Sequence, residues 1–277
     1  MTRPEAGSAR FRFSVLKPGD DKKDNIERAI LKETPIAIEY NGIGYAVMMA
    51  TPIDLEDFAT GFSLSEGLID APHQILSIER KSTAQGWILR VQLPSDKVQK
   101  VIERARQRVS ESSCGLCGMD NLDEVMRPLP QVTAMIELRK VAIFSALGTL
   151  RAYQPLSVAT GASHAAAFCA PNGKILVVRE DVGRHNSLDK LLGALAARDI
   201  FASSGFILLT ARCSFELVQK TILANCPVLV TISAATDLAI TTAANHNLTL
   251  LNLARPDGVL VDGLLADVAL AASPRND

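Results

Sequence analysis

Short apolar segments alternate with helix-like segments from Tyr153 onward, and this alternation is the feature that most constrains the fold. The pattern predicts strands at 174–178, 206–210 and 228–232, with helices at 187–197 and 215–225. The first helix carries a stripe of leucines at helical spacing, namely Leu188, Leu191, Leu192 and Leu195. Strands that alternate with helices form a sheet covered by helices, so we expect an α/β domain here.

The first half of the chain predicts a smaller α+β domain. Strands are expected at 36–40 and 45–49, joined by a turn at Asn41-Gly42, and again at 75–81 and 87–93. Between these two pairs, Asp54 is placed to cap a helix, and Gly67 stands where that helix should end. A strand at 248–252 is expected near the end of the chain.

Polar and proline-rich stretches suggest the domain boundaries. Residues 1–28 are polar and charged, so we expect a flexible arm, with regular structure beginning near Pro35. Prolines at 128 and 130 interrupt the chain before a helix expected at 138–150. The expected organisation is therefore an arm at 1–28, an α+β domain at 29–135 and an α/β domain at 136–277.

Composition excludes several classes of protein. The chain has 277 residues, 48% of them hydrophobic, and a formal net charge of −1. A non-specific nucleic-acid binder would be basic, and a transmembrane helix would need a run of about 18 apolar residues, which the sequence lacks. The N-terminus has no apolar core typical of a secretory signal. Five cysteines, an odd number, are typical of a reducing compartment, so we expect a cytoplasmic protein.

Cys114 and Cys117 form a C-x-x-C motif between glycines, and this is the most reactive-looking stretch of the sequence. The helix expected before it carries basic residues on one face, namely Lys97, Lys100, Arg104 and Arg108. Positive charge near a cysteine favours the thiolate, which is the nucleophilic form. The glycines allow the backbone to approach closely whatever the sulfur meets.

Three kinds of chemistry are compatible with this motif. A structural zinc site needs four ligands, but the other cysteines are single and no second pair exists. A thioredoxin-like redox motif would follow a strand, whereas this pair follows a helix and a polar loop. The remaining possibility is a sulfur carrier, in which one thiolate accepts a sulfane sulfur and the other takes part in relay or release. The motif alone leaves these alternatives open.

Polar residues gather where the predicted strands of the second half end. His164 precedes a segment of small residues, 179–186 follows one strand and opens a helix, and Arg212 follows the next strand. Ligands of open α/β sheets bind beyond the carboxyl ends of the strands, where helix N-termini attract anions. Zinc nucleobase deaminases need H-x-E before P-C-x-x-C, and this order is absent, so hydrolytic deamination is disfavoured.

Taken together, the motifs resemble one family, the formate dehydrogenase accessory sulfurtransferases known as FdhD, from about Glu33 to Gly258. The matching stretches are Glu33-Thr34-Pro35 with Asn41-Gly42, residues 49–67, Cys114 to Gly118, Thr160-Gly161 with His164-Ala165-Ala166, Glu180 to Asn186 with Asp189-Lys190-Leu191, and Arg212 to Lys220. Six stretches in the same order make the resemblance specific.

The resemblance implies a function and its partners. A member of this family would take sulfur from an L-cysteine desulfurase and pass it to the molybdenum (or tungsten) bis-guanine-dinucleotide cofactor before insertion into formate dehydrogenase. Cys114 would bear the persulfide and Cys117 would be its partner. The family usually forms homodimers. Its second half is expected to be a three-layer domain like that of cytidine deaminase, without the deaminase catalytic residues.

The resemblance and the strand-end pattern together suggest where the cofactor binds. The guanine-nucleotide end, for which a free guanine nucleotide is the expected mimic, would lie among the strand-end loops. The expected binding residues are His164, Arg184, His185, Arg212, Leu253, Ala254, Arg255, Pro256, Asp257 and Gly258. No resident metal is expected. The alternative function is a cofactor-binding chaperone without catalytic activity, whose C-x-x-C motif holds a structural zinc ion.

Overall fold

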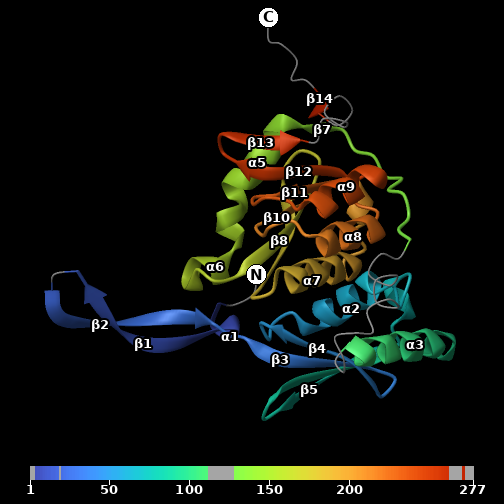
Figure 1. Cartoon of the computed structure of the whole chain (residues 1–277), viewed down its shortest axis with the longest axis horizontal. Helices are drawn as coiled ribbons and strands as arrows, with labels where there is room; N and C mark the ends of the chain where they lie inside the picture. Colours follow the sequence, from blue (N-terminus) through green and yellow to red (C-terminus); the bar gives the residue numbers. More distant parts are fainter. Residues whose placement is uncertain (1–3, 19, 112–127, 262–269, 272–277) are drawn as a thin grey trace, which may run out of the picture.

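The computed structural model describes residues 4–18, 20–111, 128–261 and 270–271. Its N-terminal unit is a four-stranded sheet of order β4-β3-β6-β5 packed against two helices (Figure 1). The elements are β3 (Thr34–Tyr40), β4 (Ile43–Ala50), α2 (Leu55–Ser65), η1 (Pro72–Gln74), β5 (Ser77–Thr83), β6 (Gly86–Gln92) and α3 (Ser95–Glu111). Alternate residues of β3 are buried against both helices, as its apolar periodicity predicts.

The predicted turns and helix ends of this unit are largely confirmed. Asn41 and Gly42 have φ values of 49° and 80°, as a tight hairpin turn requires. Gly67, with φ 64°, follows the end of α2. Asp54 does occupy the position before α2, but its side chain makes no capping hydrogen bond and instead lies 3.5 Å from Arg179.

The segment expected to be a flexible arm is a β-hairpin in the structure, so the prediction that regular structure begins near Pro35 is wrong. A short helix α1 (Pro4–Gly7) precedes β1 (Ser8–Lys17), which pairs antiparallel with β2 (Asp20–Leu31) and projects from the molecule (Figure 1). Arg10 and Glu27 lie 3.2 Å apart across the pair. The many charges suggested a solvated coil, but opposite charges across two strands are compatible with pairing.

The C-terminal unit is built on a six-stranded sheet of order β13-β12-β11-β10-β8-β9, in which β10, β11 and β12 are parallel. Helices α7, α8 and α9 bury one face of this sheet, and α5 packs on the other. The elements are β7 (Leu138–Arg139), α5 (Lys140–Leu150), η2 (Arg151–Tyr153), α6 (Pro155–Thr160), β8 (His164–Cys169), β9 (Ile175–Asp181), α7 (Arg184–Ala196), η3 (Ala202–Ser204), β10 (Phe206–Leu209), α8 (Phe215–Leu223), β11 (Val228–Thr231), α9 (Asp237–Asn245), β12 (Thr249–Arg255), β13 (Gly258–Val261) and β14 (Leu270–Ala271).

This order of strands and helices confirms the α/β prediction, whereas the likeness to cytidine deaminase stays a prediction. One segment differs. The loop expected at 253–258 is the end of β12 and its turn into β13, with a bulge where Leu253 has φ 49°. The side chain of Ala254 is buried in the core and cannot reach a ligand at the surface. Val132 packs against the C-terminal core, although the sequence assigned it to the first domain.

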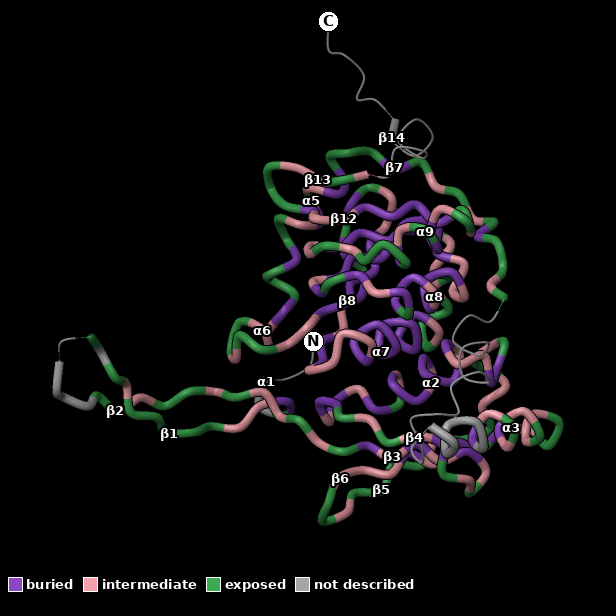
Figure 2. The backbone as a smooth tube through the Cα atoms, in the orientation of Figure 1, coloured by how far each residue is buried: buried purple, intermediate pink, exposed green. Residues whose placement is uncertain are grey.

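Helices α2 and α7 join the two units at very short range, and Figure 2 shows buried residues along both of them. A Cβ atom on Gly61 would lie 1.7 Å from the carbonyl oxygen of Asp189, and one on Gly193 would lie 1.9 Å from that of Asp57. Only glycine permits backbones to approach this closely. In the described part of the chain, no helix is both long and apolar enough to cross a bilayer.

Candidate functional site

One edge of the six-stranded sheet brings most of the predicted polar residues together. The parallel strands β10, β11 and β12 all end at this edge, and β9 ends there beside the start of β8, where His164 pairs with Asp181. Helix α7 begins there with Arg184 and His185, and Arg212 lies in the loop after β10. We call His164, Arg184, His185 and Arg212 the strand-end cluster.

His185 is held by the first turn of α8. Its Nε2 atom lies 3.2 Å from the Ser214 hydroxyl and 3.2 Å from a Glu216 carboxylate oxygen, to which Ser214 also donates at 2.8 Å. Ser214 occupies the N-cap position of α8, but its hydroxyl bonds to these side chains instead of capping the helix. Burial lowers the pKa of His185, and the charge of Glu216 only partly opposes this.

Arg184 gives this edge a positive character. Burial and, to a smaller extent, the Arg184 guanidinium lower the pKa of His164, which favours the neutral form of its ring. The Arg184 Nε atom is buried and has no hydrogen-bond partner among the described residues. Helix α7 also begins at Gly183, which has no capping side chain, and no acidic residue lies in its first turn. The positive end of the helix dipole is therefore reinforced, and the arrangement suits an anionic ligand.

Other members of the same motif face inward and have a structural role. Asp181 is fully buried and accepts hydrogen bonds from the Gly183 N–H at 2.7 Å and from Asn186 Nδ2 at 2.9 Å. Glu180 is also buried and accepts from the N–H groups of Leu156 and Ser157. These two carboxylates therefore stabilise the strand-to-helix turn and do not face a ligand.

The β12–β13 turn lies at the same edge but at a distance from the cluster. Arg255, Pro256 and Asp257 are exposed at its tip. Three strand spacings separate β12 from β8 in the sheet, which is about 14 Å. The turn and the strand-end cluster therefore cannot hold the same small group. They could contact opposite ends of one long ligand such as a nucleotide-bearing cofactor.

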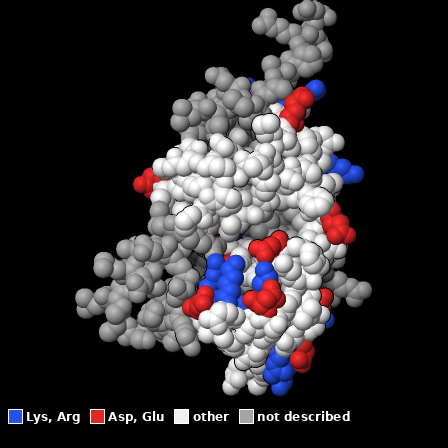
Figure 3. Space-filling model, turned by 90° about the vertical axis from the view of Figure 1, so that its right-hand side faces the viewer, with Lys and Arg blue, Asp and Glu red and all other residues white. Residues whose placement is uncertain are grey.

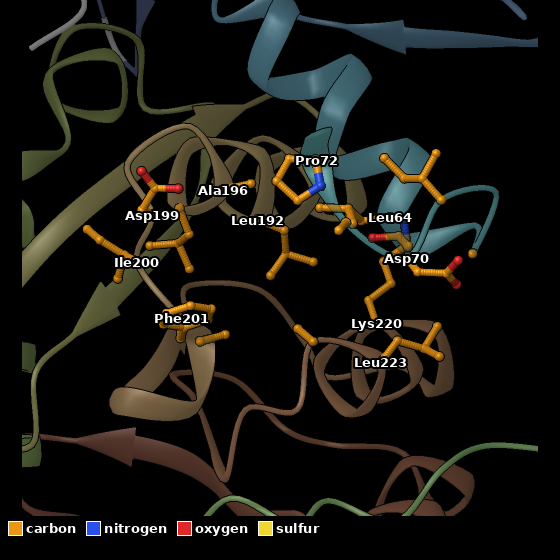
Figure 4. A pocket seen from close by; sticks show the side chains of 17 residues that line it. Leu64, Asp70, Pro72, Leu192, Ala196, Asp199, Ile200, Phe201, Lys220 and Leu223 are labelled. Atoms are coloured by element: carbon orange, nitrogen blue, oxygen red, sulfur yellow. The ribbon is translucent and has the colours of Figure 1, made fainter. Parts of the chain in front are cut away.

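A pocket that the sequence did not suggest lies at the other end of α7. It has a volume of about 460 Å³ and is lined mainly by apolar side chains, among them Leu64, Leu192, Ile200 and Phe201 (Figure 4). Lys220 also lines the pocket, and its ammonium group donates a hydrogen bond of 2.6 Å to the Asp189 carboxylate. On the face of the molecule that lies on the right of Figure 1, a mixed group of acidic and basic side chains lies below the middle, and other charged side chains are scattered near the outline (Figure 3). Since α7 has 13 residues and is about 20 Å long, this pocket is separate from the strand-end cluster.

The cysteines divide into two groups. Cys114 and Cys117 lie outside the described residues, so their roles stay predictions. Cys169, Cys213 and Cys226 are buried, and burial raises the pKa of each thiol to about 12, which makes these three unsuitable as nucleophiles. Within the described ranges no three His, Cys, Asp or Glu side chains are grouped as metal ligands.

In the sequence, Cys114 comes three positions after Glu111, the last residue of α3 in the N-terminal unit, whereas the strand-end cluster belongs to the C-terminal unit.

Comparisons of the sequence and of the structure with known proteins all point to the same family. The model of the FdhD/NarQ family matches residues 31–261. The chain is 40% identical over 264 residues to a sulfur carrier protein FdhD from Xanthomonas euvesicatoria, with 94% of each chain covered. It is 44% identical over 229 residues to one from Variovorax paradoxus, covering 83% of this chain and 82% of that protein. Its fold is similar to that seen in the crystal structure of a candidate formate dehydrogenase accessory protein from Desulfotalea psychrophila, with a TM-score of 0.72 and 23% identity. The match covers 92% of this chain and 96% of that protein.

Proposed function

Because the chain belongs to the FdhD/NarQ family, we propose that it is a sulfur carrier that serves the maturation of formate dehydrogenase. It takes sulfane sulfur from an L-cysteine desulfurase and passes it to the molybdenum bis-guanine-dinucleotide cofactor, acting as a cytoplasmic sulfurtransferase and as a homodimer. Relatives that are 40% and 44% identical over most of the chain carry the name of sulfur carrier, which supports the first part of the proposal.

Loading follows ordinary persulfide chemistry. The Cys114 thiolate attacks the sulfane sulfur of the desulfurase persulfide, the sulfur–sulfur bond of the donor breaks, and the donor cysteine leaves as a thiolate. Cys114 then carries the persulfide. Arg104 and Arg108, the basic residues of α3 nearest to Cys114 in the sequence, favour the thiolate form of Cys114 in this step.

Release uses the second cysteine. The Cys117 thiolate attacks the inner sulfur of the Cys114 persulfide, and the outer sulfur leaves as sulfide for the metal of the bound cofactor. The sulfur gains two electrons in this step, and the two thiol groups lose them as a Cys114–Cys117 disulfide forms. A cellular thiol reductant then restores both cysteines.

The observation that carries the cofactor part of the proposal is the strand-end cluster. Arg184, His164 and His185 surround a helix N-terminus that has neither a capping side chain nor an acidic residue in its first turn. An anion at this place would meet the positive end of the helix dipole and a guanidinium. The diphosphate of a guanine dinucleotide has this chemistry, and the β12–β13 turn lies where the far end of such a ligand would extend.

Titration with GDP, as a mimic of the nucleotide end of the cofactor, tests this assignment. Replacing Arg184 by Gln removes one charged donor, and such a bond contributes about 1.5–3 kcal/mol, so we expect the affinity to fall tenfold or more. Arg198→Gln is the matched control, because Arg198 is exposed just beyond the other end of α7 and donates to the Ala194 carbonyl. Equal GDP affinity of Arg184→Gln and the wild type would contradict a nucleotide site at this edge.

A further inference from the structure

A buried ion pair lies where the N-terminal unit meets the strand-end cluster. The Lys190 side chain is fully buried, and its Nζ atom lies 2.5 Å from Asp181 Oδ2 and 2.7 Å from the carbonyl oxygen of Thr51. The Thr51 N–H in turn donates to the same Asp181 oxygen at 3.0 Å. Because Thr51 directly follows β4 while the ion pair belongs to β9 and α7, these bonds connect the two units.

The same carboxylate also shapes the start of α7. Its other oxygen accepts from the Gly183 N–H and from Asn186 Nδ2. The Asn186 amide additionally donates to the carbonyl oxygen of Met49 at 2.8 Å. One carboxylate therefore fixes both the turn that presents Arg184 and His185 and the end of β4.

Stability alone does not account for a pair of this kind. Removing two charges from water is costly, and well-packed apolar residues of similar volume often stabilise a core as well or better. An apolar pair could not form hydrogen bonds with Thr51. The Thr51 carbonyl needs a buried donor, and the Thr51 N–H needs a buried acceptor. Lys190 and Asp181 supply both, and they satisfy each other.

Building on the proposed function, we infer that Lys190 and Asp181 are positioning residues for sulfur delivery. They hold the N-terminal unit, whose last helix leads within three residues to Cys114, in a fixed orientation relative to the strand-end cluster. A persulfide that must reach an acceptor bound at that cluster depends on this orientation. Loading by a desulfurase does not, because it does not require an acceptor bound at the strand-end cluster.

The test separates loading from delivery. Lys190→Met keeps the volume of the side chain but removes the donor to Thr51, and Asp181→Asn combined with Lys190→Met also restores the charge balance. Loading is measured as mass gain after incubation with a desulfurase and L-cysteine. Delivery is measured as formate dehydrogenase activity restored in cells that lack their own carrier. We expect loading within about threefold of the wild type for both variants, and delivery at least tenfold lower, since displacements near 1 Å can cost a hundredfold. Lys190→Met alone leaves the Asp181 contacts to the start of α7 in place, so its GDP affinity should also stay within about threefold.

Tyr40→Phe is the control for general destabilisation. It removes a buried hydrogen bond of 2.8 Å to Ser63, which lies entirely inside the N-terminal unit. If delivery falls no further in the double variant than in Tyr40→Phe, the inference is overturned. If Lys190→Met does not accumulate as folded protein, Thr51→Val removes only the hydroxyl that accepts from the Val182 N–H at 3.1 Å, and delivery should still fall more than loading. A wild type that neither loads sulfur nor binds GDP would instead refute the proposed function.

Discussion

Replacing Gly61 by alanine tests how closely α2 and α7 cross. The new methyl carbon would lie 1.7 Å from the carbonyl oxygen of Asp189 and 2.8 Å from the backbone nitrogen of Gly193. Both are backbone atoms of a buried helix and cannot turn aside, so the helices must separate by about 1.7 Å to reach an ordinary contact of 3.4 Å. That separation would also stretch the hydrogen bond between Ser65 and the Asp189 carboxylate, which is 2.7 Å long.

The expected effect is a loss of about 3 kcal/mol in the free energy of unfolding, at the upper end of what overpacking costs. Alanine otherwise stabilises a helix by about 1 kcal/mol relative to glycine, so the sign of the effect is informative. Gly148 in α5 is the matched control, because a Cβ atom there meets nothing within 4 Å. Gly148→Ala should therefore stabilise the protein by roughly 0.5–1 kcal/mol. Chemical denaturation measures both variants, and a Gly61→Ala protein as stable as the wild type would refute the close crossing.

Three further predictions follow from the described contacts. Burial lowers the pKa of His164 and His185 below 6.5, so the unfolded chain binds more protons than the folded chain in mild acid. The free energy of unfolding should therefore fall as the pH drops below about 6.5. Denaturation curves at several pH values should show a weaker pH dependence for His164→Gln. Glu216→Gln should lower the pKa of His185 further, measured by NMR titration, and an unchanged value would contradict the 3.2 Å contact. Thr236→Ala removes a cap on the Ala239 N–H and should cost about 1 kcal/mol of unfolding free energy; a change within error would show that water replaces the cap.

Local periodicity was sufficient to predict most regular elements. The leucine stripe of α7 and the short apolar runs of β10 and β11 are signals within single segments, and the structure places helices and strands there. The convergence of His164, Arg184, His185 and Arg212 also followed from the sequence, because an α/β alternation brings strand ends to one edge. Whether these residues bind a cofactor stays a prediction.

Contacts between distant segments were beyond such reasoning. Thr51 and Asp181 are separated by 130 positions, and no local pattern indicates that they share hydrogen bonds. The same holds for Lys220, which is 31 positions from the Asp189 carboxylate that it binds. A signal was nevertheless present, since Asp189 and Lys190 interrupt an otherwise apolar helix face. Charged residues in such a stripe are expected to be paired when the helix is buried on all sides.

The misread segments have a different cause. The hairpin of β1 and β2 was taken for a coil because charges were weighed more heavily than alternation, yet Phe11, Phe13 and Val15 recur with the period of a strand. At Leu253 a bulge with a positive φ interrupts the pairing of β12, so the strand continues beyond the point where the sequence suggests a loop. Non-glycine residues with positive φ are uncommon and are hard to anticipate from residue type.

Intact-protein mass spectrometry after incubation with a cysteine desulfurase and L-cysteine tests the central claim most directly. The proposed carrier should gain the mass of one sulfur, about 32 Da, and the gain should disappear on treatment with a thiol reductant. Cys114→Ala should abolish the gain, whereas Cys117→Ala should retain it and fail only in release. A wild type that gains no mass, with both thiols protected from alkylation by a bound zinc ion, would contradict the carrier and favour the zinc-bearing chaperone.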